Sequence, residues 1–186
     1  MKDAHKNIFN KSIHAHSCII ATEPLNQELV NKILPKNITV TDTNFITNYF
    51  HLSGDNRLLF GGKYKYNEKI SPQQQASLKR KMVEVFPELK INEIDYCWNE
   101  PINTTINGLP NVGKISSNIF YAHGYSCHSM ILSDMLGKII AEAVSGTVEK
   151  FDIFAKVKHM PLIGGDITKR TIFSLGNLWL QLRDLL

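Results

Sequence analysis

The sequence is poor in cysteine, has no long apolar run and carries little excess of either charge. Its three cysteines are odd in number and widely spaced, at Cys18, Cys97 and Cys127, and indicate neither a disulfide framework nor a zinc site. The longest apolar stretches, near Ile131 and Ile139, are interrupted by charged residues too soon for a membrane span. Lys and Arg total 21 against 17 Asp and Glu and are interspersed with them, which does not imply nucleic-acid binding. These absences predict a soluble, cytoplasmic protein without a membrane span or a nucleic-acid partner.

The chain is long enough and apolar enough to bury a core. Of its 186 residues 43% are hydrophobic, which is in the usual range for one globular unit. Strand and hairpin patterns mix with long helical ones, which favours an α+β fold: a mixed or antiparallel sheet with flanking helices. We expect a polar N-terminal lead-in over 1–16, the sheet and a strand-turn-helix segment over 17–150, and a C-terminal tail or helix over 151–186.

Local signals place the individual elements. Ser71 can cap a helix whose first position suits Pro72, and Pro87 ends that helix. The turn residues from Ser53 to Asn56 can adopt the positive φ of a tight reversal between two strands. The other expected elements are strands over 17–22, 94–105 and 118–122, a hairpin within 39–66, and helices over 26–34, 124–144 and 169–186.

The most informative motif is the junction between the strand at 118–122 and the helix that follows it. The strand breaks at Gly124, and apolar residues recur at helical spacing from there to about Val144, where Gly146 is placed to end the helix. Such a junction directs free backbone N–H groups and the positive end of a helix at one point. It therefore favours a ligand with an electron-rich edge.

Several segments in this order and spacing resemble one family. They are Ala21–Leu25, Asp55–Gly62, Leu109–Gly113, Gly124–Ser129 and Gly137–Ala143. The chain resembles the FAD-dependent amine and amino-acid oxidoreductases of the D-amino-acid oxidase, glycine oxidase and sarcosine oxidase type, above all the γ-glutamylputrescine oxidase branch. The resemblance implies the substrate-domain fold together with a C-terminal segment that faces the cofactor FAD.

The resemblance also implies which residues contact the flavin. In the family the junction reads Gly-Tyr-Ser-Gly-His-Gly, so the cofactor-binding residues expected here are Gly124, Tyr125, Ser126, Cys127, His128 and Ser129. Cys127 and Ser129 replace two glycines, where a Cβ can clash with a close ligand and a positive φ is costly. The alternative is an ordinary strand-to-helix turn. Adjacent Cys127 and His128 lack an identifiable orienting acid, so the catalytic residues stay unassigned. No metal site is expected.

On the substrate side the resemblance points to aromatic residues of the strands. Tyr49 and Trp98 are the expected substrate-binding residues, because aromatic walls exclude water around a reacting amine. Simple packing within the sheet is the alternative, since aromatics favour strands. Arg57 could pair with a substrate carboxylate, although its place just after a turn equally suits exposure to solvent.

The nucleotide-binding signature of such enzymes is missing from the sequence. A Gly-x-Gly-x-x-Gly turn opening a βαβ unit holds the FAD pyrophosphate, and this sequence has none. We therefore expect a C-terminal half that oxidises a C–N bond of an amine only together with a separate N-terminal FAD-binding chain. The alternative is a non-catalytic remnant or binding module from a split or decaying gene. A sheet face left uncovered would favour a homo-oligomer.

Overall fold

A computed structural model describes residues 8, 10–36, 38–44, 46–66, 69–162 and 166–184. The backbone divides into two compact units, each built from two separate stretches of the chain. Unit 1 comprises Met1–Ala15 with Ile102–Phe173, and unit 2 comprises His16–Pro101 with Ser174–Leu186. The sequence pattern indicated a single unit. The division was not predicted, because periodicity within a segment carries no information on which distant segments pack together. The segment boundaries expected after residues 16 and 150 remain a prediction.

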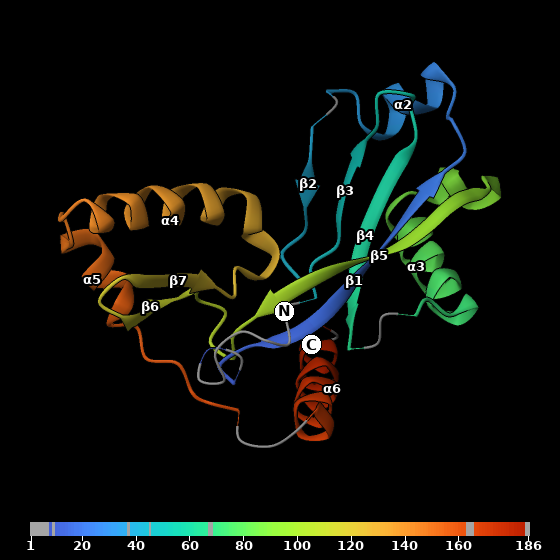
Figure 1. Ribbon diagram of the computed structural model, residues 1–186. Coiled ribbons are helices and arrows are strands. Elements are labelled where there is room, and N and C mark those ends of the chain that lie inside the picture. The colour runs from blue at the N-terminus through green and yellow to red at the C-terminus, as the bar shows by residue number, and fades with distance from the viewer. Residues whose placement is uncertain are drawn as a thin grey trace. The chain divides into compact units, whose positions relative to one another are not determined.

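Unit 2 is organised around a five-stranded sheet in the order β2-β3-β4-β1-β5 (Figure 1). The strands are β1 (Ile13–Thr22), β2 (Val40–Thr41), β3 (Tyr49–Leu52), β4 (Leu58–Lys65) and β5 (Ile94–Thr104). The pairs β1 with β4, β3 with β4 and β2 with β3 are antiparallel. The expected α+β fold with an antiparallel sheet and flanking helices is confirmed.

The hairpin between β3 and β4 forms where the turn residues predicted it. Asn56 adopts a left-handed φ of 62°, a region that asparagine tolerates better than most residues. The Ser53 N–H donates to the Arg57 carbonyl oxygen at 2.9 Å and closes the turn. Across the two strands the rings of Phe50 and Phe60 stack with centroids 5.6 Å apart. Turn chemistry and cross-strand packing therefore set the same register.

One face of the sheet is covered by helices α2 (Gln27–Ile33) and α3 (Pro72–Val85) and the 3₁₀ helix η1 (Pro87–Ile91). The Ser71 hydroxyl accepts a hydrogen bond from the Gln74 N–H, which confirms the expected helix start. Apolar side chains at helical spacing then turn toward the strands, and Leu78 and Met82 are fully buried. They join Phe50 and Phe60 in the hydrophobic core.

Unit 1 contains a two-stranded hairpin, β6 (Asn111–Ser116) with β7 (Ile119–His123), flanked by helices α4 (Ser129–Val144) and α5 (Glu149–Ala155) (Figure 1). Its core consists of Val112, Leu136, Ile139, Ala143 and Phe151. The sequence did not predict β6 or α5. Both are short, seven residues or fewer, and carry too few apolar positions for a period to be read.

The end of α4 follows its local sequence, whereas the C-terminal helix differs from the expected one. After α4, Gly146 takes a φ of 103° and its N–H donates to the Ala143 carbonyl oxygen, the arrangement that glycine favours at a helix end. The C-terminal helix α6 (Asp166–Arg183) forms in spite of Gly176 and begins three residues before the expected position. Among the described residues, no helix is both long and apolar enough to cross a lipid bilayer.

Candidate functional site

The strand-to-helix junction depends on Gly124. This residue follows the end of β7 and has a φ of 77°, which L-residues rarely adopt. A Cβ atom on Gly124 would lie 2.6 Å from Cγ2 of Thr105, closer than real contacts allow. Conformation and space therefore both require glycine here. At the strand break that the sequence indicated, the backbone of Gly124 thus packs directly against the side chain of Thr105.

After Gly124 the chain makes a 3₁₀ turn, η2 (Ser126–His128), and enters α4 at Ser129. The His128 N–H donates to the Tyr125 carbonyl oxygen at 3.1 Å. In the part of the chain that the structure describes, no side chain caps either helix start. His128 and Ser129 are exposed, so the first backbone N–H groups of α4 face solvent. The positive end of α4 is therefore free to receive an electron-rich group.

Ser126 holds the turn in a strained conformation. Its φ of 54° places a non-glycine residue in the left-handed region, which costs about 1–2 kcal/mol. The Ser126 hydroxyl lies 2.9 Å from the Thr104 hydroxyl and donates to the Gly108 carbonyl oxygen at 3.4 Å. Thr104 also forms a β-bridge with Tyr125. These contacts fix the turn and offset its strain.

Serine in place of glycine at the last position of the junction, residue 129, causes no backbone strain. Ser129 has helical angles, φ −59° and ψ −38°, which any L-residue adopts. The two positive φ values of the junction belong to Gly124 and to Ser126, which follows it by two residues. The replacement at position 129 therefore changes the space available to a ligand and leaves the fold of the turn unaffected.

The surface beside the junction combines backbone donors with apolar side chains. Met130 and Ile131, in the first turn of α4, are 86% and 73% exposed. A flavin ring is a flat, largely apolar group with an electron-rich pyrimidine edge, so it needs an apolar surface next to hydrogen-bond donors. The junction provides both. Gly124–Ser129 therefore fits FAD in the chemistry of its donor groups.

A partly buried polar network lies directly before the junction. Nε2 of His123 lies 2.9 Å from Nδ2 of Asn111, and Nδ1 lies 3.2 Å from Oδ1 of Asn103. Burial and, to a smaller extent, the positive charges of His159, His14 and Lys11 together lower the pKa of His123 to about 4. A neutral imidazole accepts from the Asn111 amide and donates to Asn103. Sequence reasoning missed this network because its members come from three separate strands.

Tyr49 packs on the five-stranded sheet at a glycine. A Cβ atom on Gly61, its cross-strand partner, would lie 2.2 Å from the Tyr49 ring, so the ring covers the bare backbone of β4. The Tyr49 hydroxyl lies 2.9 Å from the Ser17 hydroxyl. Packing within the sheet, which the sequence offered as an alternative role for Tyr49, is therefore part of its function.

Tyr49 and Trp98 share one face of this sheet. Side chains alternate between faces along a strand. Phe50 and Cys97 pack against the helix-covered core, so their neighbours Tyr49, Tyr96 and Trp98 lie on the opposite face. Trp98 is 38% exposed and lies on the edge strand β5. The structure therefore brings the two expected substrate-binding residues to the same surface of unit 2.

Arg57 is engaged in a different way from either expectation. Its guanidinium forms ion pairs with Asp55 and Asp95, donates to the Thr22 carbonyl oxygen at 2.9 Å and lies over the Tyr96 ring. Its side chain is only 16% exposed. The carboxylates raise the pKa of Arg57. Arg57 therefore ties the turn to the neighbouring strands. The expected exposure to solvent was wrong, and the pairing with a substrate carboxylate stays a prediction.

Comparison with known proteins decides the family. The model of the DAO family, described as FAD-dependent oxidoreductase, matches residues 4–143. The chain belongs to this family. The resemblance that the sequence motifs indicated is confirmed, and the matched range contains the whole junction from Gly124 to Ser129.

Two curated relatives cover nearly all of the chain. The protein named Probable oxidoreductase OrdL of Haemophilus influenzae is 38% identical over 184 residues, which is 98% of this chain and 42% of the relative. The gamma-glutamylputrescine oxidoreductase of Escherichia coli is 34% identical over 174 residues, 94% of this chain and 41% of the relative. The chain thus spans about two fifths of the length of the relatives that it matches.

Solved structures agree on the fold. The glycine oxidase from Geobacillus kaustophilus matches with a TM-score of 0.64 at 21% identity, over 81% of this chain and 40% of that protein. The L-proline dehydrogenase from P. horikoshii matches with the same TM-score at 16% identity, over 77% of this chain and 38% of that protein. At these identities the likeness concerns the fold, which is that of the corresponding part of DAO-type flavoenzymes.

Proposed function

We propose that this chain forms the substrate-domain and cofactor-facing part of an FAD-dependent enzyme that oxidises a C–N bond of an amine or amino acid, as a γ-glutamylputrescine oxidase does. The observation that carries the proposal is the Gly124–Ser129 junction, where an uncapped helix start adjoins exposed apolar side chains. Family membership and the likeness to the gamma-glutamylputrescine oxidoreductase support it.

In this proposal the six residues of the junction receive the electron-rich edge of the flavin. FAD supplies the redox chemistry when it is bound, by accepting hydride from the substrate carbon next to nitrogen. The backbone N–H groups at the start of α4 would donate to the flavin edge, and the helix end would stabilise negative charge there. Gly124 contributes by letting the backbone turn without a side chain, and Ser126 by holding that turn against Thr104.

We assign Tyr49 and Trp98 to the substrate. Both lie on the sheet face opposite the core that α2 and α3 cover, and Trp98 keeps more than a third of its surface exposed. Two aromatic rings on one surface can hold the apolar part of an amine and exclude water from the carbon that loses hydride. The hydroxyl contact of Tyr49 with Ser17 sets the orientation of its ring.

We further propose that the nucleotide-binding part of the enzyme is a separate N-terminal chain. The sequence has no Gly-x-Gly-x-x-Gly turn for the FAD pyrophosphate. Met130, Ile131 and Met135 of α4 are exposed apolar side chains close together on one helix, which suits a surface that another protein covers. A second copy of the chain could cover the same surface and would appear as a homo-oligomer.

A non-catalytic remnant or binding module is the second candidate. The observation that favours it is the pair of replaced glycines at Cys127 and Ser129, because a Cβ at either position takes up space next to the ligand. This candidate keeps the fold and the junction but loses the fit to the flavin.

Flavin absorbance separates the two candidates. We expect no tightly bound flavin in the purified chain alone, and a bound flavin that an amine substrate bleaches once a nucleotide-binding part is supplied. The unmatched part of the Haemophilus influenzae relative is a suitable source, because that relative is 38% identical. Gly124→Ala should abolish the bound flavin in the reconstituted protein. Gly137→Ala is the matched control, because a Cβ there meets nothing within 4 Å. If the reconstituted protein binds no flavin, the result would favour the non-catalytic remnant or binding module.

A further inference from the structure

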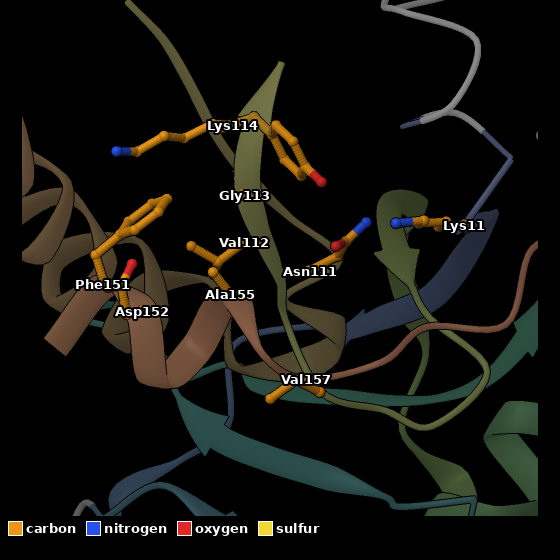
Figure 2. A pocket seen from close by; sticks show the side chains of 10 residues that line it. Lys11, Asn111, Val112, Gly113, Lys114, Phe151, Asp152, Ala155 and Val157 are labelled. Atoms are coloured by element: carbon orange, nitrogen blue, oxygen red, sulfur yellow. The ribbon is translucent and has the colours of Figure 1, made fainter. Parts of the chain in front are cut away.

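A cavity of about 350 Å³ opens in unit 1 between the β6–β7 hairpin and α5 (Figure 2). Strand β6 contributes Asn111, Gly113 and Lys114 to its lining, and α5 contributes Asp152. Its size lies within the range of small-molecule sites. Lys11, which precedes β1, completes the lining on the side of Asn111.

Two lysines lie on opposite sides of the cavity without acidic partners. Figure 2 shows Lys11 directed toward Asn111, and Lys114 extended in the other direction, toward Phe151. Within the described ranges neither lysine forms an ion pair, and neither does Asp152. The Lys114 ammonium lies 5.4 Å from the centre of the Phe151 ring, a contact that leaves its charge in place. Two cations against one carboxylate give the lining a positive charge.

A third donor enters the cavity because Gly113 has no side chain. A Cβ atom on Gly113 would lie 2.5 Å from the hydroxyl oxygen of Tyr121, so the tyrosine hydroxyl occupies the space beside the bare backbone. Burial raises the pKa of Tyr121, which keeps the hydroxyl protonated. For the residues that the structure describes, no hydrogen bond satisfies this hydroxyl. It is a free donor in a positively charged cavity.

The polar network behind the cavity stays uncharged and fixes the position of Asn111. Nδ2 of Asn111 is directed to Nε2 of His123 at 2.9 Å, and Asn103 donates onward to the Ser12 hydroxyl at 3.1 Å. Burial lowers the pKa of both His123 and His159, and the charge of Lys11 lowers both in the same direction, so the imidazoles add no further positive group. The cations that line the cavity are therefore the two lysines.

We propose that this cavity binds a small organic anion, with its carboxylate or phosphate group held by Lys11 and Tyr121. Neither donor has a hydrogen-bond acceptor or an ion-pair partner for its side chain among the described residues, and one anionic group can accept from both. Lys114, which lies against the Phe120 and Phe151 rings on the other side of the cavity, adds positive charge to the lining. Asp152 opposes large polyanions and favours a ligand of low charge. The site is separate from the Gly124–Ser129 junction and does not require flavin.

The test uses the full chain, without flavin, in a low-salt buffer that contains no phosphate. Succinate and inorganic phosphate are titrated by calorimetry and followed by NMR. We expect saturable binding that shifts the Tyr121 ring and Asn111 side-chain resonances. Loss of a charge-assisted hydrogen bond weakens binding about tenfold or more, so Lys11→Gln and Tyr121→Phe should each raise Kd by about that factor. Binding of succinate alone would identify a carboxylate site, and binding of phosphate alone a phosphate site.

Lys138→Gln is the matched control, because Lys138 is an exposed lysine of α4 outside the cavity lining. It removes the same charge and should leave Kd unchanged. Binding of neither anion overturns the proposal. Equal weakening by Lys138→Gln and Lys11→Gln also overturns it, since that result shows attraction to the surface in general. The proposal is also overturned if the anions shift only resonances of residues outside the cavity in the unaltered chain. This measurement does not depend on the folding of any variant.

Discussion

The sulfur atoms of Cys18 and Cys97 lie 3.6 Å apart, on neighbouring strands of the five-stranded sheet. Cys18 is fully buried and Cys97 is partly buried, and no disulfide joins them. Burial raises the pKa of Cys97, which keeps it protonated at neutral pH. The spacing is close enough for a disulfide to need only a small movement of the side chains.

We predict that a dithiol oxidant such as diamide joins Cys18 to Cys97. The two thiols lose two protons, and the oxidant takes up two electrons as the S–S bond forms. Because the raised pKa of Cys97 limits the thiolate, the reaction should accelerate as pH rises above neutral. Mass spectrometry of digested protein should find the Cys18–Cys97 peptide pair, with Cys127 still alkylated. Cys97→Ser should abolish the product and Cys127→Ser should not, and a main product joined through Cys127 would contradict the predicted pair.

Gly124→Ala should destabilise the protein. The positive φ costs about 1–2 kcal/mol for a residue with a Cβ, and the contact with Thr105 adds to that cost. Gly137→Ala, in the middle of α4, should raise the free energy of unfolding by about 0.5–1 kcal/mol, because alanine favours a helix and its Cβ meets nothing there. Urea denaturation of both variants gives the comparison. Equal stability of the two variants would mean that Gly124 is not in the left-handed region.

Gly61→Ala should displace the Tyr49 ring from the sheet. An alanine Cβ would overlap the ring, and such overpacking typically costs about 1–3 kcal/mol. Gly54→Ala, in the β3–β4 turn, is the control, since a Cβ at that position has no neighbour within 4 Å. If the ring is the cause, Tyr49→Ala combined with Gly61→Ala should recover most of the loss in a double-mutant cycle. Purely additive effects of the two changes would argue against the contact.

Local chemistry explains which elements the sequence could predict. The helix start at Ser71, the hairpin turn at Asn56 and the helix end at Gly146 each depend on a few consecutive residues, and each is confirmed. The junction at Gly124 was found for the same reason. Its strained residue was not, because nothing in the local sequence marks Ser126 as the one that takes a positive φ.

Contacts between distant segments could not be predicted. Cys18 and Cys97 are 79 residues apart, and only the pairing of β1 with β5 brings them together. His123 meets Asn103 and Asn111 from three strands whose relative register is a tertiary property. A polar residue at an inward position of one strand does not indicate which residue of another strand it contacts. The network and the cavity beside it therefore needed the structure.

His123 should make stability depend on pH between about 4 and 6.5. Its pKa falls from 6.5 to about 4 on folding, so in this interval the unfolded chain binds the proton and the folded chain does not. The stabilisation is complete above 6.5 and is lost as pH falls toward 4. Each pKa unit corresponds to ~1.4 kcal/mol, and solvent screening of this half-buried ring reduces the total to about 1–2 kcal/mol. Urea denaturation at several pH values in this interval gives the free energy of unfolding as a function of pH. Its slope with pH should be smaller in His123→Gln than in the unaltered chain, whereas His128→Gln, at an exposed histidine, should keep the slope of the unaltered chain. An unchanged slope in His123→Gln would show that the ring is not held neutral by the fold.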